Sequence, residues 1–151
     1  MASVLVINGP NLNLLGTRDP AVYGSKTLGD VERMCRGVAS ELGLSVEFRQ
    51  SNHEGELVDW VQQAGPECQA GRLAGVVLNA GAYSHSSLAL QDAISSVKLR
   101  VVEVHISNVY AREEFRHRSL ISPVASGVIV GFGTLGYPLA IRALHELART
   151  G

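Results

Sequence analysis

The chain lacks the features that mark several specialised classes of protein. Its net charge is −1, with 13 lysine and arginine residues against 14 aspartate and glutamate residues, whereas nucleic-acid-binding domains usually carry a basic excess. No apolar run reaches the about 18 residues of a membrane-spanning helix, and the N-terminus lacks the basic start and apolar run of a secretory signal. We therefore expect a cytoplasmic protein with no nucleic-acid or membrane partner.

Lysine and cysteine are also scarce. The chain has two lysines against eleven arginines, and its two cysteines, Cys35 and Cys68, show neither Cys-x-x-Cys spacing nor a histidine at zinc-ligand spacing. A disulfide framework and a zinc site are therefore not expected. Lysine forms Schiff bases, whereas arginine binds carboxylates and hydroxyl-rich anions through its planar fork. We expect arginine to bind a small acid, and we expect neither a metal nor a cofactor.

Short apolar runs alternate with longer amphipathic stretches along the 151 residues, of which 46% are hydrophobic and 18% are charged. This length and composition predict a single domain over residues 1–151 with a full core. Strands are expected at Ser3–Ile7, Leu44–Arg49, Ala74–Leu78, Val101–Ile106 and Gly127–Val130. These runs are mostly apolar throughout, which is typical of strands covered on both faces.

Apolar residues at helical spacing occupy the intervals between these strands. Helices are expected at Leu28–Leu42, Leu57–Ala64, Leu88–Val97 and Gly136–Arg149. Cys35 falls on the apolar face of the first helix, and Pro66 is expected to end the second. Thr27 and Asp30 have the spacing of a capping box, and Asn52 is placed to cap the second helix.

This alternation of strands and helices predicts the fold class. Parallel strands joined by right-handed helical crossovers form a sheet with helices on both faces. Five strands in a chain of this size predict an α/β fold with a flavodoxin-like, doubly wound, five-stranded parallel sheet. Ligands of such sheets bind outside the carboxyl ends of the strands.

Polar residues follow three of the expected strands. They are Asn8, Asn11, Asn13, Arg18 and Tyr23 after the first strand, Asn79 and His85 after the third, and Glu103, His105, Ser107, Arg112, Arg116 and Arg118 around the end of the fourth. Because parallel strands end at one edge of the sheet, these side chains should share one rim. The long first connection is unusual in a compact domain, so residues 12–26 are expected to include an active-site lid.

These residue types suit proton transfer. Tyrosine is a weak base at its reference pKa of about 10, but a neighbouring cation such as Arg18 favours the phenolate. Asn11 can donate hydrogen bonds to a developing oxyanion. His105 can deliver a proton, with Glu103 on the same strand face to orient it. The residues predict a lyase or isomerase that acts on a small hydroxylated acid.

Each of these residues also has a purely structural interpretation. Tyr23 beside Gly24 can be a packed turn residue, and His105 can be a hydrogen-bonded core histidine. The arginine-rich segment after the fourth strand can be a solvated turn. The convergence of three loops on one rim favours the functional interpretation.

A glycine motif near the C-terminus supports a different hypothesis. Gly131–Gly136 spells Gly-x-Gly-x-x-Gly, a dinucleotide-binding pattern, but no further strand follows it and no acidic residue lies about 20 positions on. The alternatives to an enzyme are a flavodoxin-like module that binds a nucleotide or phosphate here, and a structural oligomer whose rim contacts other subunits.

Several long motifs resemble those of type II 3-dehydroquinate dehydratases. They are NGPNLNLLG at 8–16, Arg18 through Tyr23-Gly24, NAGAYSHSS at 79–87, EVHISN at 103–108 and AREEFR at 111–116. The resemblance covers essentially the whole chain, and the family's flavodoxin-like fold agrees with the fold derived above. It implies dehydration of 3-dehydroquinate to 3-dehydroshikimate, in the shikimate pathway of aromatic amino acid biosynthesis or in quinate catabolism.

The resemblance also implies a role for each matching residue. Tyr23 would take the proton beside the ketone, and Arg18 would keep it ionised. Asn11 would hold the enolate through a water, and His105, oriented by Glu103, would protonate the departing hydroxyl. The residues implied to bind substrate are Asn79, His85, Ile106 through its backbone, Ser107 and Arg116, with Arg112 on the mobile rim.

Three further expectations follow from the resemblance. Asp92 matches a residue that family members lend to a neighbouring subunit's site, which implies a homododecamer built from trimers. Asp19 stands where the family often has glutamate, and residues 65–71 form a slightly longer stretch than usual; neither touches an assigned role.

The positions of the two lysines bear on the mechanism. Lys98 precedes the fourth strand, at the wrong end of the sheet, and Lys26 opens the first helix. An enolate mechanism without a Schiff base is therefore expected.

Overall fold

The structure is a computed structural model that describes residues 2–17 and 19–151. Its strands are β1 (Ser3–Asn8), β2 (Ser45–Gln50), β3 (Leu73–Asn79), β4 (Val101–His105) and β5 (Gly127–Val130). They form one sheet in the order β2-β1-β3-β4-β5, and every neighbouring pair is parallel. This is the strand order of the flavodoxin-like fold, so the predicted fold class is confirmed.

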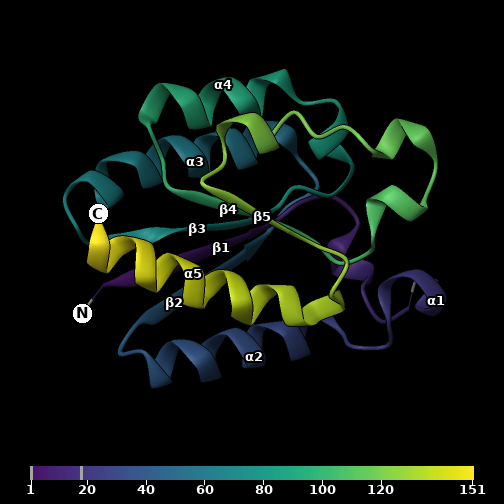
Figure 1. Ribbon diagram of the computed structural model, residues 1–151, viewed down its shortest axis with the longest axis horizontal. Helices are drawn as coiled ribbons and strands as arrows, with labels where there is room; N and C mark the ends of the chain where they lie inside the picture. The colour runs from purple at the N-terminus through teal and green to yellow at the C-terminus, as the bar shows by residue number, and fades with distance from the viewer. Residues whose placement is uncertain (1, 18) are drawn as a thin grey trace.

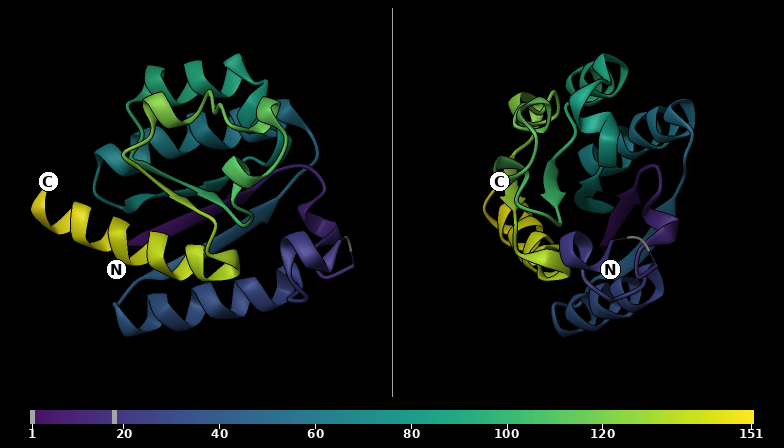
Figure 2. Two further views of the ribbon diagram at one scale, coloured as in Figure 1. Left: turned by 45° about the vertical axis from the view of Figure 1, so that its right-hand side comes forward. Right: turned by 90° about the vertical axis from the view of Figure 1, so that its right-hand side faces the viewer.

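The helices cover both faces of this sheet (Figures 1 and 2). They are α1 (Pro20–Tyr23), α2 (Leu28–Glu41), α3 (Glu54–Gln69), α4 (Leu88–Val97) and α5 (Gly136–Thr150). α2 and α5 pack on one face, and α3 and α4 pack on the other. None of these helices, among the residues described, is long and apolar enough to cross a membrane.

The core has one layer on each side of the sheet, because successive side chains of a strand point to opposite faces. Along β1, Val4 and Val6 join the cluster under α2 and α5, whereas Leu5 and Ile7 join the cluster under α3 and α4. The two ends of the chain lie at the amino ends of the strands, on the left in Figure 1. The carboxyl ends of the strands, and the loops that follow them, lie at the opposite edge.

The apolar pattern located the main elements well. Each expected strand end lies within one residue of its position in the structure. The capping box of α2 is confirmed, since the Asp30 amide donates to Thr27 Oγ1 at 3.2 Å and the Thr27 amide donates to Asp30 Oδ2 at 2.9 Å. Cys35 is fully buried, as expected, and burial raises the pKa of its thiol to about 12.

Two local predictions about α3 are wrong. The helix continues through Pro66 to Gln69. Proline clashes with the backbone N–H and the Cβ of the residue before it, and Gly65 has no Cβ, which removes one of these two clashes. The N-cap of α3 is His53, which makes no side-chain cap. Asn52 instead accepts a hydrogen bond of 3.0 Å from the backbone amide of Asn11, so it holds the loop after β1.

Substitution of Gly65 tests the packing of α3 on α4. A Cβ added at Gly65 would lie 2.5 Å from Cβ of Val97. We therefore expect Gly65→Ala to lower the free energy of unfolding by roughly 1–3 kcal/mol, although alanine is the better helix former.

The matched control is Gly55→Ala in the same helix. Gly55 is exposed, and an added Cβ there meets no described atom within 4 Å. This substitution should raise the free energy of unfolding by up to about 1 kcal/mol. Urea unfolding measures both variants, and equal effects would contradict the close packing at Gly65.

Candidate active site

A cavity of about 160 Å³ lies at the carboxyl edge of the sheet. It is lined by Pro10, Asn11, Leu12, Tyr23, Asn79, Gly81, Ala82, His85, His105, Ile106, Ser107, Val109, Arg112 and Arg116. Most of the residues predicted to form the site are in this set. The loops after β1, β3 and β4 therefore meet at one cavity, as the parallel topology requires.

His105 and Glu103 form the buried end of the site. They are two residues apart on β4, so their side chains project from the same face of the sheet, and Glu103 is fully buried. Nε2 of His105 donates to Oε2 of Glu103. The second ring nitrogen, Nδ1, is then the one left for proton transfer at the cavity that His105 lines.

Two serine hydroxyls complete the shell of Glu103. Ser119 Oγ donates to Oε2 at 2.6 Å, and Ser122 Oγ donates to Oε1 at 2.5 Å. Burial alone raises the pKa of Glu103, but the hydrogen bonds from His105, Ser119 and Ser122 together lower this pKa by more, so it falls below the usual value. Glu103 is therefore an ionised carboxylate in the interior at neutral pH.

Tyr23 enters the cavity from the loop after β1 and contacts Arg112 from the loop after β4. Nη1 of Arg112 donates to Tyr23 Oη at 2.9 Å, and the guanidinium lies 5.4 Å from the centre of the tyrosine ring. Nη1 is also 3.4 Å from Ser107 Oγ. Arg112 was expected only on the mobile rim of the site, whereas in the structure it contacts Tyr23 directly. Arg18, expected beside Tyr23, lies outside the described residues.

The loop after β1 is held tightly against the loop after β3. A Cβ at Gly9 would lie 2.4 Å from the carbonyl oxygen of Ala80, so only glycine permits this approach. Asn11 follows in the left-handed conformation, with φ of 68°, and lines the cavity. Its position is set by the hydrogen bond from its amide to Asn52 described above.

Asn79 belongs to a buried network as well as to the cavity wall. Its Nδ2 donates to Tyr137 Oη at 2.8 Å, and its Oδ1 accepts from the Gly81 amide at 3.2 Å. Tyr137 Oη in turn donates to Asn8 Oδ1 at 2.7 Å, and burial raises the pKa of Tyr137 above its usual value. The network ties α5 to the ends of β1 and β3, a structural use of Asn79 that its expected role in binding did not include.

His85 and Arg116 line the cavity from opposite loops. Nδ1 of His85 lies 2.8 Å from the carbonyl oxygen of Arg118; a carbonyl only accepts, so Nδ1 carries the proton and Nε2 is the acceptor nitrogen. The ring of His85 is stacked on that of His105, with centroids 6.3 Å apart. Nε of Arg116 donates to Glu113 at 2.9 Å, which leaves the other guanidinium nitrogens for an anion.

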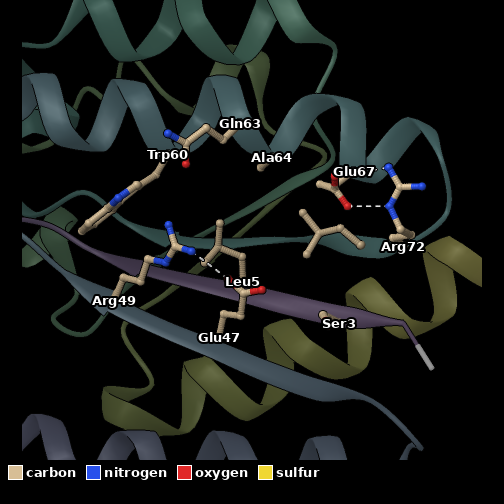
Figure 3. Close-up of a pocket in the computed structure, with 10 residues that line it drawn as sticks. Ser3, Leu5, Glu47, Arg49, Trp60, Gln63, Ala64, Glu67 and Arg72 are labelled. Atoms are coloured by element: carbon tan, nitrogen blue, oxygen red, sulfur yellow. Dashed lines mark hydrogen bonds and ion pairs between the residues drawn. The ribbon is translucent and has the colours of Figure 1, made fainter.

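A larger cavity of about 470 Å³ lies between α3 and strands β1 and β2 (Figure 3). Its charged side chains are paired with each other: Arg49 with Glu47 at 2.8 Å and Arg72 with Glu67 at 2.7 Å. Arg49 also lies over the ring of Trp60, 5.5 Å from its centre. None of the predicted site residues lines this cavity. Its volume is greater, but Tyr23, His105 and most of the other predicted site residues line the smaller cavity.

The glycine motif after β5 has a structural role. The amides of Gly131 and Gly133 donate to the carbonyl oxygens of His105 and Ile106, at 3.1 and 3.0 Å. A Cβ at Gly136 would lie 3.1 Å from Cγ1 of Val104. The two amides that a dinucleotide-binding turn would offer to phosphate are thus bonded to the end of β4.

Comparison with known proteins identifies the family. A family profile described as dehydroquinase class II matches residues 2–145, nearly the whole chain. The chain belongs to the class II dehydroquinase family. The fold described above is therefore that of a class II dehydroquinase.

Named relatives and solved structures agree with this assignment. The chain is 61% identical to 3-dehydroquinate dehydratase 2 of Ralstonia nicotianae, over 98% of this chain and 96% of that protein. It is 59% identical to 3-dehydroquinate dehydratase of Variovorax paradoxus, over 95% and 99%. The crystal structure of type II dehydroquinase from Butyrivibrio crossotus has a TM-score of 0.89 and 45% identity, covering 95% of this chain and 97% of that one.

Among the residues that the structure describes, two that were expected in the dehydroquinase site are not in the cavity wall. Glu103 lies behind His105, as its expected orienting role requires. Asp92 is exposed on α4 and does not line the cavity. Sequence reasoning also missed Ser119 and Ser122, because serines in an irregular loop carry no pattern that points to a buried carboxylate.

Replacing Glu103 by glutamine tests the buried charge. Hydrogen bonds to a charged group contribute about 1.5–3 kcal/mol, so we expect Glu103→Gln to lower the free energy of unfolding by roughly 2–3 kcal/mol at pH 7. The folded pKa of Glu103 lies below the usual 4.5, so this stabilisation is present above about pH 4.5 and is lost as the pH falls through the folded pKa.

Urea unfolding between pH 7 and pH 3.5 measures the free energy of unfolding of wild type and of Glu103→Gln. The difference between these two free energies should narrow at the acid end of this range. The exposed Glu56 provides the control, as Glu56→Gln. A difference at Glu103 that stays constant across the range would show that no buried carboxylate charge is involved.

Proposed function

We propose that the chain dehydrates 3-dehydroquinate to 3-dehydroshikimate through an enolate intermediate, with neither a Schiff base nor a metal. The relatives named as 3-dehydroquinate dehydratases support the reaction. One observation of the site carries the mechanism: Tyr23 and His105 line one cavity, and each contacts a charged partner, Arg112 and Glu103 respectively. Such a cavity can both accept and donate a proton.

In the first step, Tyr23 acts as the base. The Arg112 guanidinium at its hydroxyl favours the phenolate, and Arg18 has the same role. Tyr23 Oη takes a proton from the methylene carbon between the ketone and the carbon that bears the leaving hydroxyl. The C–H electron pair becomes the enolate double bond, and the ketone oxygen takes the negative charge. Asn11 stabilises that charge through a bridging water.

In the second step, His105 acts as the acid. The enolate re-forms the ketone, its double-bond electrons form the new carbon–carbon double bond, and the C–O bond breaks. The departing hydroxyl takes the proton from Nδ1 of His105 and leaves as water. The Glu103 carboxylate stabilises His105 as imidazolium, which is the protonated form that can donate this proton. Exchange with solvent then returns Tyr23 and His105 to their starting states.

The remaining residues bind the substrate. Its carboxylate and hydroxyls are held by Asn79, His85, the backbone of Ile106, Ser107 and Arg116. A lid within residues 12–26 covers this site. Asp92, exposed on α4, contributes to a neighbouring subunit's site in a homododecamer built from trimers. The enzyme serves in the cytoplasm, in the shikimate pathway or in quinate catabolism.

The first test is a continuous ultraviolet assay with 3-dehydroquinate. The product is a conjugated enone and absorbs where the substrate does not. We expect the wild type to give a rising signal and Tyr23→Phe to lose at least about 1000-fold in kcat, since base catalysis alone contributes about 10²–10⁴-fold, with substrate binding largely retained.

Tyr110→Phe is the matched control, because Tyr110 is 63% exposed and does not line the cavity. Turnover by Tyr23→Phe at the wild-type rate would assign the base to another group. Folded wild type without turnover would overturn the proposed function.

Loss of the Arg116 side chain should weaken substrate binding. We expect Arg116→Ala to raise KM roughly 10- to 100-fold with a smaller change in kcat, because it removes a charged hydrogen-bonding group from the cavity wall. Arg118→Ala is the control, since this exposed side chain does not line the cavity. A fall in kcat alone would contradict a binding role for Arg116.

Borohydride trapping tests the absence of a Schiff base. Neither Lys26 nor Lys98 lines the cavity. We therefore expect borohydride added during turnover to leave both lysines unmodified in the intact-mass spectrum and the activity unchanged. A lysine adduct that forms only with substrate would contradict the enolate mechanism.

A further inference from the structure

We propose that Ser119 and Ser122 are positioning residues that hold the buried Glu103 carboxylate so that His105 is kept as a strong, correctly oriented acid. This inference rests on the proposed dehydration. It extends the site to two serines that do not themselves line the cavity.

The two hydroxyls hold both oxygens of the carboxylate. Ser122 Oγ donates to Oε1 at 2.5 Å and Ser119 Oγ donates to Oε2 at 2.6 Å. Oε2 is also the oxygen that accepts from Nε2 of His105. Because each oxygen has its own hydroxyl donor, the plane of the carboxylate is fixed, and so is the direction in which Oε2 meets the imidazole.

The hydroxyl of Ser119 can donate in only one direction. Its oxygen accepts from the amides of Ile121 and Ser122, at 3.1 and 3.2 Å. A hydroxyl has one hydrogen and two lone pairs. Two N–H groups occupy the lone pairs, so the hydrogen is committed to Glu103.

The turn that carries both serines is anchored independently of Glu103. Between the serines, the Leu120 amide donates to the carbonyl oxygen of Ser84 at 2.7 Å. The carbonyl oxygen of Leu120 accepts from Nε2 of Gln91 on α4, also at 2.7 Å. The next residue, Ile121, is fully buried in the core. The serines are thus presented to the carboxylate by a turn that is already fixed.

This arrangement decides where the proton between Glu103 and His105 lies. A buried carboxylate without donors takes up a proton, and His105 would then be a neutral imidazole, which is a much weaker acid than imidazolium. Among the residues that the structure describes, the other titratable groups around His105 are His85, stacked on its ring, and Tyr23, Arg112 and Arg116 in the cavity wall. Ser119 and Ser122 contact none of these groups; their hydroxyls act on His105 only through the Glu103 carboxylate.

The test compares Ser119→Ala, Ser122→Ala and the double variant with wild type in the ultraviolet assay. We expect each single variant to lower kcat roughly 10-fold or more, by analogy with other second-layer partners, and to change KM less than about threefold. The pair of Glu103 and His105 loses its shared proton at the basic limb of the kcat–pH profile. Removing a donor to Glu103 destabilises the state without that proton, in which His105 is neutral and Glu103 is charged, more than the state that holds it. The basic limb should therefore move to higher pH, by about half a unit or more.

Ser95→Ala on the exposed face of α4 is the control. Ser122→Cys fills the space of the serine side chain with a slightly larger group that is a weaker donor. It leaves no cavity, so it should fold even where alanine does not, and its kcat should fall between those of wild type and alanine. Wild-type kcat and an unshifted pH profile in folded Ser119→Ala and Ser122→Ala, or wild-type kcat in Ser122→Cys, would overturn the positioning role. Absence of turnover in the wild type would instead overturn the proposed function, and this inference with it.

Discussion

The site depends on one buried negative charge. Glu103 is fully enclosed, and a carboxylate in such a place stays ionised only if donors surround it. One donor is His105 on its own strand; the others come from Ser119 and Ser122, at the end of the long connection between β4 and β5. Satisfying this charge therefore orients the imidazole, and it draws two of its donors from the connection that also carries Arg112.

This arrangement links, across the cavity, the two groups proposed to transfer protons. The connection that supplies the two serines also places Arg112 on Tyr23, with 2.9 Å between Nη1 and Oη. The proposed acid and the proposed base thus have partners of opposite charge: a carboxylate beside His105 and a guanidinium beside Tyr23. A carboxylate favours a protonated neighbour and a guanidinium favours a deprotonated one. Two groups in one small cavity can therefore give and take a proton in the same turnover.

Local patterns predicted the fold and the residue content of the site, but not its connections. Apolar runs placed the strands because strands covered on both faces must be apolar. Pro66 was misjudged because the course of α3 depends on the missing Cβ of Gly65, a feature of its neighbours rather than of proline. The contact of Arg112 with Tyr23 joins residues 89 positions apart, and no spacing rule reaches so far.

In the proposed mechanism, proton removal and hydroxyl loss are separate steps carried out by different residues. Incubation of His105→Asn with 3-dehydroquinate in deuterium oxide separates the two steps. We expect proton NMR of the substrate to show deuterium entering the methylene beside the ketone faster than without protein, while no enone forms. No exchange above the protein-free rate in folded His105→Asn, or equal exchange by Tyr23→Phe, would contradict this mechanism.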